Sequence, residues 1–262
     1  MNMESNKKIV ILSIRRKHFP NTTHIVEKLK RAGVNVIHPK TIRDFEKACK
    51  VISSNDIIIT LYFSKNNSFR KQLVALEKKG CMLMDHPNKM RLTENRKKTM
   101  ELLSKSNIKI PNFYFGHPDC IPNHLGNKLV IKHPFGLAIG FIDTKRAREI
   151  NQKNIYVEEI LLNPKKTVRC ITYVFGMVFT RIKKDKFDIG FADIPGTEPK
   201  TSTSKKDRIL AQKVHKLTGM ELFNVDLIDE VVIEINCCPN FFLYDSIVKH
   251  FVKRIIELSQ KQ

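Results

Sequence analysis

The sequence has few of the features that mark membrane or secreted proteins. No apolar run approaches the roughly 18 residues that a membrane-spanning helix needs. The first apolar run, Ile9–Ile14, follows a polar N-terminus and is too short for the core of a signal peptide. It is expected to form the first β-strand instead. We therefore expect a soluble, cytoplasmic protein that does not act at a membrane.

Cysteine spacing and aromatic content exclude further classes. The six cysteines contain no CxxC pair and no zinc-ribbon spacing, so reduced thiols are expected in a chain of this length without a secretion signal. Tryptophan is absent, and no RNA-recognition signature, helix-turn-helix spacing or aromatic stacking run is present. Nucleic acid is therefore an unlikely direct partner.

The chain has a strong excess of positive charge. Lys and Arg total 47 against 26 Asp and Glu, which gives a formal net charge of +21 over 262 residues. Such an excess favours an anionic partner, such as nucleotide phosphates, a polyphosphate or an acidic polypeptide. The lysines are scattered along the chain, so a composition rich in Lys, Asn and Ile that merely reflects base composition is the alternative explanation.

The first third of the chain alternates strand-like and helix-like segments. Strands are expected at Ile9–Ile14, Val34–His38, Asp56–Phe63 and Cys81–Met84. Helices are expected at Thr22–Ala32, Phe45–Val51 and Ser68–Lys79, with glycines ending the first and the last. This alternation predicts a small parallel sheet covered by helices.

Beyond Asp85-His86-Pro87 the pattern changes to two helices followed by antiparallel strands. Helices are expected at Asn88–Glu94, Asn95–Ser106, Thr144–Ile150 (capped by Thr144), Ser204–Leu217 and Tyr244–Leu258. Strands are expected at Lys128–Lys132, Leu137–Ile142, Ile155–Leu162, Thr167–Phe175 and Met177–Lys183, and a loop at Asp185–Thr203. The predicted fold class is α/β followed by α+β.

Two apolar strands near the C-terminus carry the most informative polar residues. Leu222–Ile228 and Val231–Ile235 are joined by a two-residue turn and predict a β-hairpin. Glu234 and Asn236 face the same way because side chains alternate along a strand, and the hairpin can bring Asp226 beside them. Carboxylates within apolar strands are costly to bury without a cation, and hard oxygen ligands suit Mg²⁺. The alternative is that Glu234 points to solvent from a half-exposed strand.

Taken together, these segments resemble the ATP-grasp superfamily, and specifically its RimK-like branch of carboxylate–amine (glutamate) ligases. Five segments carry the resemblance in the expected order: MRLTENRKKTMELLSKSNIKIPNFYF, KLVIKHPFG, IYVEEILL, TVRCITYVFGMVF and VDLIDEVVIEINCCPN. The resemblance implies a small N-terminal parallel α/β domain in residues 1–87, a central lobe in residues 88–157 and a C-terminal lobe in residues 158–262. The two α+β lobes would clamp ATP between them.

The resemblance also implies which residues hold ATP. Lys132 would contact the α- and β-phosphates, and Arg96 would add a second contact. Glu158, Glu159 and Ile160 would meet adenine, mostly through backbone groups, and Glu159 is a loose candidate for the ribose hydroxyls.

The catalytic centre follows from the same resemblance. Asp226, Glu234 and Asn236 would hold one or two Mg²⁺ ions, with Mn²⁺ as an alternative. Arg169 and Arg181 would stabilise the γ-phosphate or an acyl-phosphate; their alternative is an exposed, solvated face. In these ligases a substrate carboxylate attacks the γ-phosphate, and an amine then attacks the acyl-phosphate. The implied acceptor is an anionic small molecule or an acidic peptide, and a homo-oligomer is frequent in the family.

Three departures from the family pattern leave other functions open. The phosphate loop is the short HPFGLAIG, Thr167 replaces the aspartate of the D-x-R segment, and GFADIPGT retains only Asp193 of the γ-phosphate stretch. One alternative is a kinase similar to the inositol polyphosphate kinases of the same superfamily, which the positive charge would suit. Another is a degenerate protein that binds ATP without turning it over.

Overall fold

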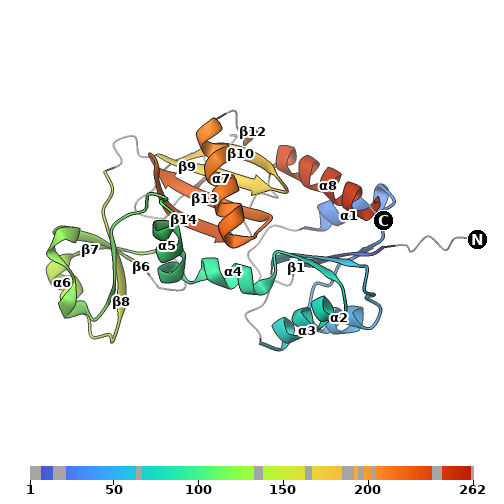
Figure 1. The fold of residues 1–262 in the computed structure, drawn as a ribbon, viewed down its shortest axis with the longest axis horizontal. Coiled ribbons are helices and arrows are strands. Elements are labelled where there is room, and N and C mark those ends of the chain that lie inside the picture. The colour runs from blue at the N-terminus through green and yellow to red at the C-terminus, as the bar shows by residue number, and fades with distance from the viewer. Residues whose placement is uncertain are drawn as a thin grey trace, which may run out of the picture.

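The structure is a computed structural model with three β-sheets joined by helices (Figure 1). It describes residues 7–13, 22–62, 67–132, 138–162, 167–184, 192–193, 198–201, 204–237 and 244–260. In the part described, no helix has both the length and the apolar character needed to cross a membrane.

The N-terminal sheet is parallel, as the βαβα alternation predicts. Its strands are β1 (Ile9–Ser13), β2 (Val36–Ile37), β3 (Ile57–Tyr62) and β4 (Met82–Met84), in the order β2-β1-β3-β4. The covering helices are α1 (Thr23–Arg31), α2 (Ile42–Cys49) and α3 (Asn67–Lys78). Alternate residues of β1 serve opposite faces: Ile9 and Ile11 pack with α1, whereas Val10 and Leu12 pack with α2 and α3. This explains why the strand is apolar at every position from Ile9 to Leu12.

Two helices, α4 (Pro87–Glu94) and α5 (Arg96–Lys105), lead to a second sheet (Figure 1). Asn95 separates them, and its side chain caps α5 by accepting from the Lys98 N–H at 3.1 Å. The second sheet is antiparallel, in the order β5-β8-β6-β7. Its strands are β5 (Phe113–Gly116), β6 (Lys128–Lys132), β7 (Ala138–Asp143) and β8 (Ile155–Glu159).

The second sheet contains one strand that was not predicted and one predicted helix cap that is wrong. Strand β5 was not predicted, because its four residues are all half-buried and show no alternation. The short helix α6 (Thr144–Arg148) is not capped by Thr144: Asp143 occupies the N-cap position, and the Thr144 hydroxyl donates to the Gly126 carbonyl at 2.6 Å.

The third sheet runs β11-β10-β9-β13-β14 and is antiparallel. The long strands are β9 (Thr167–Val174), β10 (Met177–Lys184), β13 (Leu222–Ile228) and β14 (Val231–Cys237). Short strands β11 (Ala192–Asp193) and β12 (Lys200–Thr201) pair with β10 within the segment predicted as a loop, most of which lies outside the described residues. Helices α7 (Lys205–Thr218) and α8 (Asp245–Gln260) complete this part.

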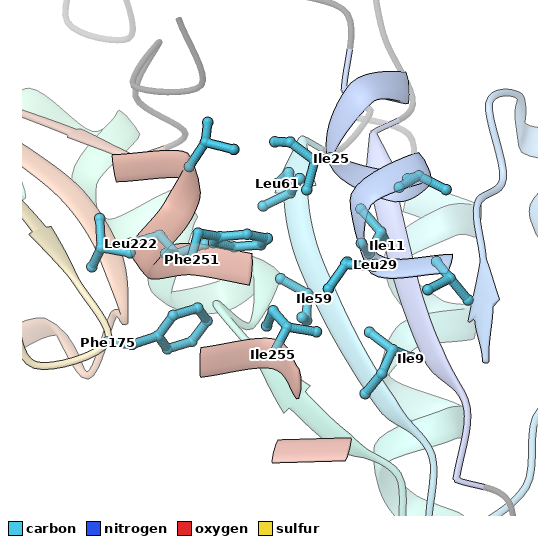
Figure 2. Close-up of a cluster of buried hydrophobic side chains, with 14 of the residues drawn as sticks. Ile9, Ile11, Ile25, Leu29, Ile59, Leu61, Phe175, Leu222, Phe251 and Ile255 are labelled. Carbon is cyan, nitrogen blue, oxygen red and sulfur yellow. The ribbon is translucent and has the colours of Figure 1, made fainter. Parts of the chain in front are cut away.

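The third sheet buries its two faces in different cores. Tyr173, Phe223 and Val225 pack under Ala211 and Val214 of α7. The opposite face contributes Val174, Phe179 and Leu222 to a core with α8, α1 and the N-terminal sheet; Figure 2 shows Phe175 and Leu222 facing Phe251 and Ile255 there. The α8-side core covers only one end of that face, and the site described next occupies the other end.

Candidate functional site

The register of the third sheet gathers polar residues on its α8-side face. Asp226 lies directly opposite Glu234 on β14 and opposite Cys170 on β9, and Cys170 lies opposite Arg181 on β10. Directly paired residues share a face of a sheet, so these side chains point the same way. The hairpin therefore brings the two predicted carboxylates side by side, with Asn236 two residues further along the same face.

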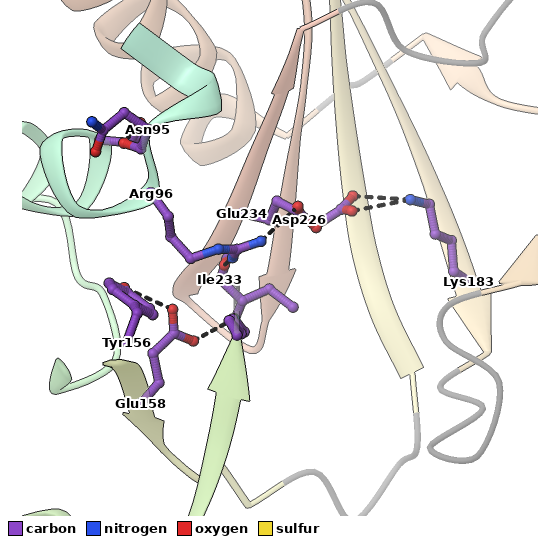
Figure 3. A network of polar contacts seen from close by, with 10 residues as sticks. Asn95, Arg96, Tyr156, Glu158, Lys183, Asp226, Ile233 and Glu234 are labelled. Carbon is purple, nitrogen blue, oxygen red and sulfur yellow. Dashed lines mark hydrogen bonds and ion pairs between the residues drawn. The ribbon is translucent and has the colours of Figure 1, made fainter. Parts of the chain in front are cut away.

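Asp226 is held by a lysine that sequence reasoning missed. Its side chain is 2% exposed, and the Lys183 ammonium donates to both of its carboxylate oxygens at 3.1 Å (Figure 3). Burial is the largest single influence and disfavours the charged lysine, but the charge of Asp226, its hydrogen bonds and the nearby Cys170 together raise the pKa of Lys183. The missed signal was alternation: Lys183 stands two residues after Arg181 in the predicted strand and must share its face.

Glu234 is held from the opposite side by α5. The Arg96 guanidinium, whose residue is 7% exposed, donates from Nη2 to Glu234 Oε1 at 3.0 Å. Figure 3 shows Arg96 reaching from the start of α5 towards Glu234, while Asp226 turns away towards Lys183. The cap at Asn95 fixes where α5 begins and so where Arg96 points.

A third ion pair lies on the second sheet, next to Arg96. The Lys132 ammonium donates to the Glu158 carboxylate, and the Tyr156 hydroxyl donates to the same carboxylate at 2.9 Å. Burial lowers the pKa of Lys132 and outweighs the opposing attraction of Glu158; the nearby Arg96 charge lowers it further. Lys132 also feels the charge of Glu234 on the third sheet. The Lys132–Glu158 pair of the second sheet and the Glu234 carboxylate of the third sheet therefore lie on either side of Arg96.

Arg181 completes the cationic side of this face. Its guanidinium lies 4.7 Å from the centre of the Tyr244 ring and donates to the Tyr244 hydroxyl just before α8. Burial, reinforced by Asp226, raises the pKa of the Cys170 thiol beside it to about 12. Cys170 is therefore a protonated packing residue and not a nucleophile.

Two predicted residues do not join the group. The Arg169 side chain lies on the α7 side of the sheet, where it contacts Asp207 at 3.3 Å and Glu230 at 3.4 Å. Residues 169 and 170 alternate, so Arg169 faces away from Asp226. The Glu159 carboxylate accepts from the backbone N–H and the amide of Asn112 at 2.8 and 3.0 Å, pointing away from Glu158.

The remaining predicted positions lie at the edges. Ile160 follows β8 and is half-buried, as the segment between the two sheets requires. The phosphate-loop residues 133–137, most of GFADIPGT and residues 238–240 lie outside the described residues, as does the side chain of Asp193.

The donor set fits Mg²⁺. Asp226 and Glu234 supply carboxylate oxygens. Asn224, directly opposite Asn236, is 3% exposed, and its Oδ1 has no hydrogen-bond partner among the residues that the structure describes. Hard oxygens of this kind are the ligands that Mg²⁺ takes. Over the described ranges, no three His, Cys, Asp or Glu side chains cluster closely enough to hold a metal. A bound Mg²⁺ would therefore also need amide, water or phosphate oxygens.

Comparison with known proteins identifies the fold. No family model matches the sequence, and no curated protein matches it. The ATP-grasp ligase PsnB, solved with a minimal precursor, Mg and ADP, is 13% identical with a TM-score of 0.70, and the match covers 99% of each chain. The macrocyclase MdnC, bound to precursor peptide MdnA from Microcystis aeruginosa MRC, is 14% identical with a TM-score of 0.66, covering 98% of this chain and 100% of MdnC.

A third neighbour extends the range of substrates found on this fold. D-alanine–D-alanine ligase from Bacillus anthracis, complexed with ATP, is 11% identical with a TM-score of 0.64, covering 97% of this chain and 96% of the ligase. At such identities the likeness establishes the fold alone. The chain has the ATP-grasp fold over nearly its whole length, as the sequence resemblance implies.

Proposed function

We propose that this chain is an ATP- and Mg²⁺-dependent ligase of the RimK-like type, which joins a carboxylate to an amine through an acyl-phosphate. One observation carries the proposal: the ion pairs Lys132–Glu158, Arg96–Glu234 and Lys183–Asp226 lie on one face of the third sheet and at its junction with the second. Buried ion pairs are weak devices for stability, so three together favour a functional role. The full-length likeness to solved ATP-grasp ligases supports the same conclusion.

The cations of the site would bind the nucleotide phosphates. Lys132 and Arg96 both lie at the junction of the two sheets and carry charges that suit phosphate oxygens. Glu158 leads out of β8 into Ile160, whose backbone would meet adenine. Glu159 is tied to Asn112, so we assign it no contact with the ribose.

Asp226, Glu234 and Asn236 would hold the metal. Bound Mg²⁺, or Mn²⁺ in its place, neutralises the β- and γ-phosphates and aligns them for transfer. The sheet fixes these three residues on one face, because β13 and β14 are paired in register through Asp226 and Glu234. Their positions are thus set before any ligand arrives.

The reaction has two steps. A carboxylate oxygen of the acceptor attacks the γ-phosphorus, and the bond to the bridging oxygen breaks to release ADP. The amine nitrogen then attacks the acyl carbon, inorganic phosphate leaves, and the nitrogen loses a proton. Arg181, fixed against Tyr244 on the site face, would stabilise the transferred phosphate. Arg169 has no role in these steps, because its guanidinium is engaged behind the sheet.

The acceptor is proposed to be an acidic peptide or an anionic small molecule. The net charge of +21 favours such a substrate. Two of the structural neighbours, PsnB and MdnC, were solved with precursor peptides. A phosphate-rich alcohol, the substrate of a kinase, would exploit the same charge and is the competing candidate.

The test is ADP release combined with a thermal melt. Mg·ATP should raise the melting temperature of the wild type, because a ligand that binds only the folded state stabilises it. Acidic peptides, amino acids and inositol phosphates are then screened with and without an added amine. A ligase releases ADP only when carboxylate and amine are both present. ADP release with an inositol phosphate alone would make the chain a kinase, and a melt shift without ADP release would make it a binding protein.

A further inference from the structure

Lys183 occupies the place that the proposed metal would need. Its ammonium lies 3.1 Å from both carboxylate oxygens of Asp226, and the two residues are 8% and 2% exposed. It stands on β10, two strands away from β13, so its long side chain reaches over β9 to make this contact. Both carboxylate oxygens of Asp226, which could coordinate a metal ion, are therefore already bound to the Lys183 ammonium.

The second carboxylate of the metal site is engaged in the same way. Arg96 holds Glu234 at 3.0 Å from the opposite side. The two acids face each other in register, yet each turns to its own cation (Figure 3). A buried carboxylate without a counter-ion is unfavourable, so some positive charge must always accompany Asp226. Lysine suits an exchangeable partner, since its point charge sits on a flexible four-carbon chain.

We propose that Lys183 is the resident cation of the metal site: it neutralises Asp226 before metal binds, and a divalent ion enters only by displacing the Lys183 ammonium. This inference rests on the proposed function and deepens it. Lys183 is a positioning residue, because it acts through the metal ligand Asp226. The displaced ammonium would turn to the nucleotide phosphates, as would Arg96 when it leaves Glu234.

This exchange couples metal and nucleotide binding. Without nucleotide, a divalent ion must separate the Lys183 ammonium from Asp226 with no phosphate present to receive it, and the affinity for the ion is low. With nucleotide present, the phosphates receive the displaced cations and the metal receives the carboxylates. Removing the charge of Lys183 should therefore let a divalent ion bind in the absence of nucleotide.

The experiment measures Mn²⁺ binding without nucleotide, from the electron paramagnetic resonance signal of free Mn²⁺. Lys183→Gln removes the charge and keeps a hydrogen-bond donor near Asp226. It should bind Mn²⁺ at least tenfold more tightly than the wild type, and Mn²⁺ alone should raise its melting temperature. Lys216→Gln removes the same charge from the exposed face of α7 and should match the wild type. The double variant Lys183→Gln/Asp226→Asn should lose the gained site.

Equal Mn²⁺ affinity in Lys183→Gln and the wild type would overturn the inference. If Lys183→Gln does not fold without metal, circular dichroism with added Mn²⁺ decides: recovery of the fold supports the exchange, and no recovery contradicts it. Mg·ATP melts of the wild type separate this result from the proposed function. If Mg·ATP raises the melting temperature of the wild type but Lys183→Gln binds Mn²⁺ no more tightly, only the exchange is contradicted. If Lys183→Gln binds Mn²⁺ more tightly but Mg·ATP does not raise the melting temperature of the wild type, only the nucleotide function is contradicted.

Discussion

The two faces of the third sheet carry ion pairs of similar composition in different settings. On the α7 side, Arg169 contacts Asp207 and Glu230, and Asp207 also accepts from the Thr180 hydroxyl at 3.0 Å. This group ties the start of α7 to the sheet. On the α8 side, Asp226 pairs with Lys183 and Glu234 pairs with Arg96. Both cations could bind phosphate.

The difference shows how position assigns a role to the same chemistry. Asp207 lies in the first turn of α7, where a carboxylate is favourable beside the helix N-terminus even without an arginine. Asp226 lies within a fully buried strand and has no helix to stabilise it. A buried ion pair such as Asp226–Lys183 adds little to stability, so folding alone explains it poorly. The comparison therefore indicates a structural role for the pairs on the α7 face and supports the ligand-binding role proposed for the α8 face.

The largest effect is expected where a buried carboxylate loses its cation. Lys132→Met removes the ammonium from Glu158, which is 2% exposed, and keeps the hydrogen bond from the Tyr156 hydroxyl. Breaking one side of a buried pair costs about 3–5 kcal/mol, so urea unfolding should show a loss of that size, together with weaker ATP binding. Lys128→Met, at the exposed end of the same strand, is the matched control. Normal stability and normal ATP affinity in Lys132→Met would remove Lys132 from the site.

Asp85 extends the comparison to a buried carboxylate that forms no ion pair with any side chain in the described part of the chain. It is 3% exposed, has a φ of 55°, and accepts from the Glu221 N–H at 2.6 Å. Burial raises its pKa from 3.8 to about 7. The folded state therefore holds a proton that the unfolded state has lost, so this group reduces stability as pH rises from about 4 to about 7. The loss is roughly 3–4 kcal/mol, at 1.36 kcal/mol per pKa unit.

The measurement is the free energy of unfolding of the wild type and Asp85→Asn across this pH range. Asparagine remains neutral and tolerates a positive φ. The two proteins should be similar near pH 4, and the variant should become the more stable one near pH 8. Parallel stability curves would mean that Asp85 is not protonated in the folded protein at neutral pH.

Much of the fold was readable from the sequence because its elements are strongly patterned. Strand β6 has the predicted ends, and α7 and the β13–β14 hairpin begin within one residue of prediction. Strand β13 is buried at every position and is mostly apolar, and the hairpin needs only a two-residue turn. The half-buried β5 gave no such pattern.

The site was only partly readable. The hairpin was predictable from local sequence, but the pairing of Asp226 with Glu234 also depends on a register shift between Asp226 and Leu227, which alternation alone does not encode. Family resemblance placed both Arg169 and Arg181 at the site, but Arg181 pairs with Cys170, the neighbour of Arg169, so the two arginines lie on opposite faces of the sheet. The contact of Arg96 with Glu234 spans 138 residues, and no local pattern encodes a partner so distant.

Glu234→Gln tests the ligand-binding face directly. The Glu234 side chain is 29% exposed, and glutamine can still accept from Arg96, so the fold should persist. At one hundred times its Kd, Mg·ATP stabilises a folded protein by about 2.7 kcal/mol, and the variant should lose this stabilisation in a thermal melt. Glu101→Gln on the exposed side of α5 is the control. An unchanged Mg·ATP shift in Glu234→Gln would remove Glu234 from the metal site.

Arg169→Met tests the other face, where the effect should be smallest and confined to stability. Asp207 loses its arginine but keeps the Thr180 hydroxyl, so we expect a loss of about 1–3 kcal/mol in the free energy of unfolding. The Mg·ATP melt shift should equal that of the wild type, because the guanidinium faces α7 and not Asp226. Arg181→Met, two strand positions from Lys183 on the site face, should instead reduce ADP release. Loss of nucleotide binding in Arg169→Met would show that the two faces are not functionally separate.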